Sequence, residues 1–290
     1  MDHFVDVHPA ETQSFSEAIT MSDPLGTSSR TAAHTANART WDAYARNQRR
    51  FARPVTDKEF RERVEAVTRD PFLEGPFVNR QLLCLGSGGG MQSALYAAAG
   101  AEVTVVDISP EMLALDRQVA TDRGLTLKTL EASIDALEAL DASRFDIVVQ
   151  PVSSCYVPDV EAVYRQVARV ICPGGLYVSQ HKQPGSLQAS VKPGSLGYSL
   201  ETPYYDRGPL PAVTGSPHRE EGTFEFLHRW ESLIGGLCRC GFTVEDLSEP
   251  MHGDANASRG SFAHRSWFLP PYVRVKARRS ADPTAPAVQV

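Results

Sequence analysis

The chain has 290 residues, of which 42% are hydrophobic, and a formal net charge of -6 at pH 7. This is enough apolar material for one large domain, alone or with appendages. The negative balance argues against a nucleic-acid partner, because phosphates attract basic surfaces. No apolar run reaches the length of a membrane span, and the N-terminus lacks the pattern of a signal peptide. We therefore expect a cytoplasmic protein without a membrane partner.

The five cysteines show no paired CxxC spacing. Cys84, Cys155 and Cys172 lie in apolar segments, where thiols usually pack as small hydrophobic groups. Reduced thiols fit this pattern best. Cys238 and Cys240 leave open a metal or redox pair, although they stand late in a helical pattern.

The first 38 residues show little periodicity and are rich in Ser, Thr, Ala and His, so we expect a disordered tail. Thr40 is a plausible N-cap for a helical stretch that carries Trp41, Tyr44 and Phe60 at amphipathic spacing. Residues 39–75 are thus predicted to form a pair of helices that pack on the rest of the domain.

A glycine cluster follows the first apolar run. Residues 81–85 read as a buried strand, glycines stand at Gly86, Gly88 and Gly90, and a helical pattern covers residues 92–99. Glycine allows a sharp turn and a close approach of the backbone to a ligand. A helix that starts there points free N–H groups at the same place. Strand, glycine turn and helix together predict a nucleotide-type site.

An acid ends the next apolar run. Residues 102–107 read as a second buried strand that finishes at Asp107, about twenty residues after Gly86. In nucleotide-binding folds a carboxylate at this point accepts hydrogen bonds from the ribose hydroxyls. The third glycine of the dinucleotide fingerprint would fall at position 91, which is Met91. The spacing GxGxG therefore counts against a dinucleotide.

Strands and helices continue to alternate downstream. Ser109-Pro110 starts a helix, residues 125–131 form a third strand, Ser133 can cap a helix that runs to Leu140, and residues 144–150 form a fourth strand. A helix through Val170 and a strand over 172–181 follow. Five alternating strands predict a parallel sheet with right-handed crossovers.

The pattern breaks over residues 183–221, which are rich in Pro, Gly and Ser. A structureless stretch of this length is usually functional or disordered. An insertion after the fifth strand would lie above the carboxyl ends of the strands, where open α/β sheets bind ligands. We interpret it as a cover over the site of the molecule acted on, the acceptor. We then expect a helix over 224–237, a strand over 242–247 and a last strand over 267–276. Residues 280–290 read as a tail.

These motifs, in this order, resemble class I S-adenosylmethionine (SAM) methyltransferases of the small-molecule type 11 group. The resemblance rests on the GxGxG turn, Asp107, Phe145-Asp146, Pro173-Gly174-Gly175 and Gly241-Phe242, and it covers residues 41–278 apart from the insertion. Cys84 departs from the family, which often has an acid there. The resemblance implies an α/β fold with a Rossmann-like, seven-stranded, mostly parallel sheet, an antiparallel last strand, and helices on both faces. SAM would be the donor and S-adenosylhomocysteine the product.

The resemblance also implies cofactor contacts by position. The run Trp41-Asp-x-Tyr44-Ala resembles the lid helix that covers the cofactor, with Tyr44 placed over it. Ser133 and Ile134 occupy the loop that meets the adenine. The full set of expected cofactor residues is Tyr44, Gly86, Ser87, Gly88, Asp107, Ile108, Met112, Ser133, Ile134, Gln150 and Pro151.

Catalytic and acceptor residues are expected near the ends of the fourth and fifth strands. A base is needed only if the acceptor enters protonated; His181, His228 and Tyr156 are the candidates, with His218 as a further histidine. Gln180, Lys182, Tyr204 and Tyr205 are candidates for holding the acceptor. The histidines lack short ligand spacing, so we expect no metal.

The sequence thus predicts methyl transfer to a small-molecule acceptor by in-line displacement. The alternatives are a protein or RNA methyltransferase, a non-catalytic SAM-binding module, and an NAD-dependent enzyme on the same fold. Whether the chain is a monomer or a homodimer stays open.

Overall fold

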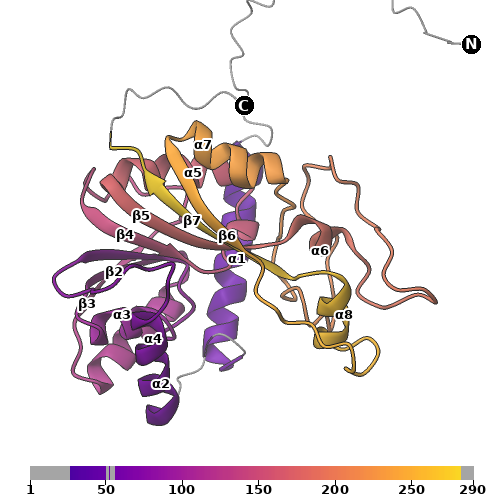
Figure 1. Ribbon diagram of the computed structural model, residues 1–290, viewed down its shortest axis with the longest axis horizontal. Coiled ribbons are helices and arrows are strands. Elements are labelled where there is room, and N and C mark those ends of the chain that lie inside the picture. Colours follow the sequence, from indigo (N-terminus) through magenta and orange to yellow (C-terminus); the bar gives the residue numbers. More distant parts are fainter. Residues whose placement is uncertain (1–26, 50–51, 53–55, 282–290) are drawn as a thin grey trace, which may run out of the picture.

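The structure, a computed structural model, describes residues 27–49, 52 and 56–281 (Figure 1). The expected tails at residues 1–26 and 282–290 lie outside the described residues. The strands are β1 Gln81–Leu85, β2 Glu102–Asp107, β3 Leu127–Glu131, β4 Phe145–Gln150, β5 Ile171–Lys182, β6 Phe242–Ser248 and β7 Tyr272–Arg279. The α-helices are α1 Thr27–Arg46, α2 Asp57–Thr68, α3 Ser93–Ala98, α4 Pro110–Asp122, α5 Val160–Val170, α6 Pro184–Gln188, α7 Gly236–Arg239 and α8 Phe262–Phe268.

The strands form one seven-stranded sheet in the order β3-β2-β1-β4-β5-β7-β6. The first five strands of this order pair in parallel. Strand β7 runs antiparallel to both β5 and β6, between which it is inserted. The predicted Rossmann-like sheet with an antiparallel last strand is therefore confirmed. The parallel strands all end at the same edge, which is where such sheets bind ligands.

Alternate residues of each central strand face opposite sides of the sheet, as the two-residue period of a strand requires. Leu83 and Tyr177 pack in the core under α5 and α7. Leu82 and Val178 pack in the core on the other face, which includes residues of α3 and α4. Figure 1 shows α5 and α7 above the sheet and α2, α3 and α4 below it. Both faces are thus covered, which explains why these strands read as continuous apolar runs.

The starts of the predicted helices have the expected caps. The Ser109 side chain accepts a hydrogen bond from the Met112 N–H, and Pro110 follows at the first helical position of α4. Asp159 accepts from the Glu161 N–H at the start of α5. These local signals explain why the boundaries of both helices could be predicted to within one or two residues.

Helix α1 begins earlier than the sequence suggests. It starts at Thr27, so the prediction of a tail up to residue 38 is wrong for residues 27–38. Within them, Ala33 and Asn37 are buried. The polar composition of this segment hid the helix, because most of its stabilisation comes from packing against distant parts of the chain.

Two further segments that were expected to be helical are not helical in the described part of the chain. Residues 133–140 form turns, in which Ser133 donates to the Asp135 carboxylate at 2.5 Å and does not cap a helix. Residues 224–229 are extended, and the Phe226 N–H donates to Cys155 O at 2.7 Å. The helix predicted from residue 224 begins only at Trp230, with a π-helical turn, η2 Glu231–Gly235, before α7.

The last strand also begins later than expected. Trp267 and Phe268 belong to α8, and β7 starts at Tyr272. The apolar residues at 267–269 suggest a strand, but the Ser261 side chain accepts a hydrogen bond from the His264 N–H and starts a helix there.

The insertion after β5 packs against α8, and Figure 1 shows α6 and α8 together at one side of the sheet. Arg265 of α8, only 2% exposed, holds them together. Its guanidinium donates to Ser186 O at 2.6 Å, Ala189 O at 2.9 Å and Ser190 O at 3.0 Å. One buried arginine thus satisfies carbonyl groups that would otherwise be unpaired in an irregular segment.

Within the part of the chain that the structure describes, no helix has both the length and the apolar character needed to cross a membrane.

Candidate functional site

A cavity of about 380 Å³ lies where the parallel strands end. Its volume is typical of small-molecule sites. It is walled by the turn after β1, the ends of β2, β3 and β4, parts of β5 and β7, helix α1 and the insertion. The lining residues are His34, Asn37, Trp41, Arg63, Gly86, Ser87, Gly88, Met91, Gln92, Asp107, Ile108, Met112, Ser133, Ile134, Pro151, Val152, Ser153, Tyr156, Val157, Gln180, Glu220, His252, Phe262 and Tyr272.

The glycine turn after β1 needs glycine for two reasons. Gly86, Gly88, Gly89 and Gly90 have φ from 59° to 81°, a region that side chains disfavour. A Cβ on Gly86 would also lie 2.7 Å from the Cβ of Ser153. The turn therefore brings bare backbone to the wall of the cavity.

Asp116 of α4 fixes this turn, and nothing in the sequence pattern marked it. Its carboxylate accepts from the Gly90 N–H at 2.8 Å and from the Ser93 hydroxyl. The residue is fully buried, and burial raises the pKa of its carboxyl to about 6. A carboxylate that accepts two hydrogen bonds in the interior anchors the loop to the helix behind it.

Two polar side chains line the cavity beside the turn. The Ser87 hydroxyl is buried and has no hydrogen-bond partner among the described residues. Asp107, at the end of β2, accepts from the Ser109 N–H at 3.0 Å. Burial raises the pKa of the Asp107 carboxyl to about 7, because a charge in a dry site is unfavourable. Both groups are thus available to a polar ligand.

Helix α1 contributes His34 to the loop after β3. Its Nε2 lies 3.4 Å from the Ser133 hydroxyl and 3.5 Å from the Asp135 carboxylate. Ser133 and Ile134 line the cavity here, as does His34. His34 could not be predicted as a site residue, because the composition of residues 1–38 indicates a tail. We call the part of the cavity formed by Gly86–Gly88, Asp107 and Ser133–Ile134 the glycine end.

Aromatic rings wall the other part of the cavity. The Trp41 and Tyr156 rings meet edge to face, with centroids 5.3 Å apart. The His252 ring lies 5.9 Å from Phe262 and 5.4 Å from Tyr272, centroid to centroid. We call this part, with Gln180 and Glu220, the aromatic end. His252, Phe262, Tyr272 and Glu220 come from loops or element ends without periodicity, so no sequence signal marked them as a set.

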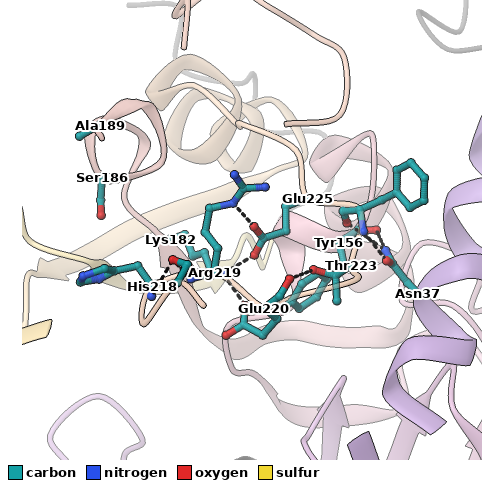
Figure 2. Close-up of polar contacts among 12 residues, drawn as sticks. Asn37, Tyr156, Lys182, Ser186, Ala189, His218, Arg219, Glu220, Thr223 and Glu225 are labelled. Carbon is teal, nitrogen blue, oxygen red and sulfur yellow. Dashed lines mark hydrogen bonds and ion pairs between the residues drawn. The ribbon is translucent and has the colours of Figure 1, made fainter. Parts of the chain in front are cut away.

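A buried charge network lies behind the aromatic end, as Figure 2 shows. The Lys182 ammonium contacts Glu220 at 2.6 Å and also contacts Glu225. Arg219 pairs with Glu225, and the Tyr156 hydroxyl donates to Glu220 at 2.8 Å. Two cations therefore balance two carboxylates. Glu225 is fully buried, and such a charge is tolerated only because it is paired on both sides.

Helix α1 is fastened to the segment that carries Glu220. The Asn37 amide donates to Phe224 O and Tyr156 O, each at 3.0 Å, and accepts from the Phe224 N–H at 2.7 Å (Figure 2). The Thr40 hydroxyl donates to Gly222 O at 2.8 Å. The helix over the cavity is thus held by the backbone of residues 222–224.

Nine of the eleven residues expected around the cofactor line the cavity, namely Gly86, Ser87, Gly88, Asp107, Ile108, Met112, Ser133, Ile134 and Pro151. Tyr44 does not: its hydroxyl donates to Glu221 O at 3.3 Å, and Trp41 stands on the cavity wall instead. Gln150 does not either, because its amide donates to the Ser153 hydroxyl at 3.0 Å and accepts from the Tyr177 hydroxyl.

The two histidines expected as bases lie outside the cavity wall. Both ring nitrogens of His181 are engaged, Nδ1 with the Ser154 hydroxyl at 2.7 Å and Nε2 with the Ser179 hydroxyl at 2.8 Å. Burial lowers the pKa of His181 to about 3. The His228 Nε2 lies 2.9 Å from Ser154 O, in the extended segment where a helix was expected. Both rings are held in structural contacts and neither lines the cavity, so neither is placed to act as a base.

Of the expected acceptor residues, Gln180 lines the cavity. Lys182 lies behind the wall in the charge network, with its side chain 3% exposed. The Tyr204 hydroxyl accepts from the Trp230 N–H at 3.3 Å, and Tyr205 is exposed on the surface. His218 packs against Phe262 with its ring stacked at 4.8 Å.

The cysteines and histidines form no metal centre in the described part of the chain, where no group of three or more His, Cys, Asp or Glu side chains could hold an ion. All five cysteines are free thiols. Cys84 and Cys155 are buried, as expected of thiols that pack as small apolar groups.

Comparison with known proteins agrees with this geometry. A family model described as a methyltransferase domain matches residues 83–179. The uncharacterized methyltransferase YbaJ of Bacillus subtilis is 34% identical over 182 residues, which are 61% of this chain and 71% of that protein. A ubiquinone biosynthesis O-methyltransferase of Xanthomonas axonopodis pv. citri is 34% identical over 113 residues, 38% of this chain and 47% of that protein. The match thus spans just under half of the second relative.

A solved structure of a SAM-dependent methyltransferase from Mesorhizobium loti has the same fold, with a TM-score of 0.57 and 24% identity over 75% of this chain and 96% of that one. The chain belongs to the class I SAM-dependent methyltransferases. It is an enzyme that uses SAM as methyl donor.

Proposed function

We propose that the glycine end of the cavity binds SAM and that the aromatic end receives a small-molecule acceptor. The observation that carries the donor assignment is that a carboxylate, Asp107, and the bare backbone of Gly86 and Gly88 lie in the wall of one cavity. Asp107 would accept hydrogen bonds from the ribose hydroxyls. The glycine turn would hold the part of SAM that lies closest to the backbone.

The residues present fit SAM. Ser87 offers a buried hydroxyl without a partner among the described residues, and a ligand can satisfy it. Ser133 and Ile134, with His34 beside them, form a mixed polar and apolar loop that suits the adenine. When bound, SAM supplies a methyl group carried on a positively charged sulfur. Met112, Ile108 and Pro151 supply the apolar part of the wall.

The chain's own residues mainly position the acceptor, because an in-line displacement depends on alignment. Tyr156 lines the aromatic end, but its hydroxyl donates to Glu220, and burial raises its pKa well above the ordinary value. Tyr156 therefore serves as a hydrogen-bond donor to Glu220 and not as a base. Gln180 offers an amide at the end of β5.

A small acceptor is supported by the shape and charge of the site. The aromatic end is walled by rings from α1, the residues after β4, and the β6–β7 connection. The net charge of -6 gives no general attraction for nucleic acid. The relatives named as ubiquinone biosynthesis O-methyltransferases support the same proposal.

The donor assignment is tested with Asp107→Asn, which keeps the shape of the side chain and removes its charge. We expect SAM affinity, measured by calorimetry, to fall roughly ten- to hundredfold, the cost of losing charge-assisted hydrogen bonds. Glu131→Gln is the matched control, because Glu131 pairs in register with Asp107 on the next strand and does not line the cavity. Unchanged affinity in Asp107→Asn would refute the assignment.

The acceptor class is tested by incubating cell extracts with the protein and methyl-labelled SAM. Label in the small-molecule fraction supports the proposal. Label in protein or RNA would identify the macromolecular alternative instead. SAM binding without any transfer would identify a non-catalytic module, and tighter binding of NAD than of SAM in calorimetry would identify a redox enzyme.

A further inference from the structure

Glu220 is the charged group at the aromatic end of the cavity. It follows the irregular insertion and reaches the cavity wall with its side chain 13% exposed. Its partners come from the ends of neighbouring strands: Tyr156 follows β4, and Lys182 ends β5. The glycine end lies under β1, β2 and β3, on the other side of β4 in the sheet order. Glu220 thus belongs to the β4–β5 side of the cavity, and the glycine turn belongs to the β1–β2 side.

The contacts of Glu220 hold its carboxylate at the cavity wall. Both the Tyr156 hydroxyl, at 2.8 Å, and the Lys182 ammonium, at 2.6 Å, meet the same oxygen, Oε2. The Glu225 carboxyl also lies within hydrogen-bonding reach of Glu220. Two donors on Oε2 fix the orientation of the group, as a binding residue requires.

The charge of Glu220 persists at neutral pH. Burial is the largest single influence and disfavours the ionised form, but the Lys182 charge and the hydrogen bonds to Glu220 together outweigh it and hold the pKa of the Glu220 carboxyl below its ordinary value. Lys182 itself is shared with Glu225 and does not reach the cavity wall. A ligand at the aromatic end therefore meets the carboxylate and not the ammonium.

The side chains around Glu220 restrict the shape of the ligand that this end of the cavity can bind. The Trp41 and Tyr156 rings, 5.3 Å apart, and the cluster of His252, Phe262 and Tyr272 give this end flat, apolar walls. Such walls favour a planar ring. A carboxylate accepts hydrogen bonds and cannot donate them, so it pairs with an O–H or N–H group and repels an anion.

We propose that Glu220 binds the methyl acceptor, and that it selects flat, apolar molecules that carry a hydroxyl or amine group while rejecting those that carry a carboxylate. This inference rests on the proposed function, since it assigns the acceptor class of the same cavity.

The test uses the full chain saturated with S-adenosylhomocysteine and three probes that differ in one substituent: 2-naphthol, 2-naphthylamine and 2-naphthoate. Binding is measured by calorimetry. We expect the wild type to bind the first two about tenfold or more tightly than the third, because a like-charge contact is costly. Glu220→Gln should abolish this preference, and Glu221→Gln, an exposed neighbour, should retain it.

A wild type that binds none of the probes, or binds 2-naphthoate as tightly as 2-naphthol, would overturn the inference. So would a preference that survives in Glu220→Gln. If Glu220→Gln does not fold, Glu220→Asp serves in its place, because it keeps a charge near Lys182 but moves that charge away from the cavity. We expect the preference of Glu220→Asp for 2-naphthol over 2-naphthoate to shrink several-fold. An unchanged preference contradicts the inference. SAM affinity measured in the same variants separates the two proposals, because loss of SAM binding by the wild type would refute the donor site alone.

Discussion

The glycine end and the aromatic end of the cavity are built in different ways. The glycine end comes from short segments that each follow a strand: residues 86–91 after β1, 107–112 at the end of β2 and 133–134 after β3. The aromatic end joins residues far apart in the chain, such as Trp41 with Tyr156 and Tyr156 with Glu220. The first kind of site is encoded locally, and the second exists only once the whole domain has folded.

The largest expected effect is at the glycine end, in Gly86→Ala. The new Cβ would lie 2.7 Å from the Ser153 Cβ at a residue whose φ is +59°. We expect a loss of about 2–4 kcal/mol in the free energy of unfolding, from the left-handed backbone and the clash together. Thermal denaturation measures this loss, and calorimetry should show weaker SAM binding.

Gly124→Ala is the matched control for this variant, because Gly124 has φ +64° and nothing within 4 Å of the position its Cβ would take. It should lose only about 1 kcal/mol of stability and keep its SAM affinity. Equal losses in the two variants would show that close approach at Gly86 is unimportant.

The next effect is at the aromatic end, in Asn37→Ala. The substitution removes three hydrogen bonds of a buried amide and leaves the Phe224 and Tyr156 backbone groups unpaired. We expect a loss of about 2–3 kcal/mol in stability and a larger fall in methyl transfer than in SAM affinity. In Asn47→Ala, which removes an exposed bond within one helix turn, the loss should stay within about 0.5 kcal/mol. A fall in SAM affinity as large as the fall in transfer would contradict the division into two ends.

The smallest effect concerns pH. Burial raises the pKa of Asp107 to about 7, with Asp116 and Asp42 adding like charge nearby. The ionised form is the better acceptor for ribose hydroxyls, so SAM binding should release a proton below pH 7. SAM affinity is expected to fall about tenfold from pH 8 to pH 6.

The raised pKa of Asp107 makes the stability of the ligand-free protein change with pH in the opposite direction to SAM affinity. Between about pH 4 and pH 7 the folded state holds the Asp107 proton more tightly than the unfolded state, so the Asp107 contribution to stability decreases as pH rises. In Asp107→Asn, SAM affinity should lose its pH dependence in calorimetry. The decrease of stability with pH should become smaller in denaturation curves but should not vanish, because Asp116, with a pKa raised to about 6, keeps its own contribution. A SAM affinity that stays pH-dependent in this variant would assign the effect to another group.

The contrast between the two ends also explains what the sequence could predict. The sheet followed from apolar runs and capping residues, and Gly86, Ser87, Gly88 and Asp107 followed from their place after strands. His181 failed as a base candidate because a strand end does not reveal that neighbouring serines occupy both ring nitrogens.

The prediction of a helix over residues 224–229 is wrong for a related reason. Glu225 and Phe226 make long-range backbone bonds, to Leu210 and Cys155, in place of helical ones. Helix propensity reflects only local interactions along the chain, whereas the conformation of this segment is set by its tertiary contacts. Glu220 belongs to the same group, because its neighbours Tyr156 and Lys182 lie 64 and 38 residues away in sequence.

The early start of α1 has a practical consequence for anyone who shortens this protein. Composition would place the N-terminal boundary at residue 39, just before Thr40 and Trp41. A cut there removes both His34, which reaches Ser133 and Asp135, and Asn37, which holds Phe224. One deletion would therefore damage the two ends of the cavity at once, although the whole sheet and every glycine of the turn would remain. A shortened protein for binding or crystallisation work should keep α1 from Thr27 onward.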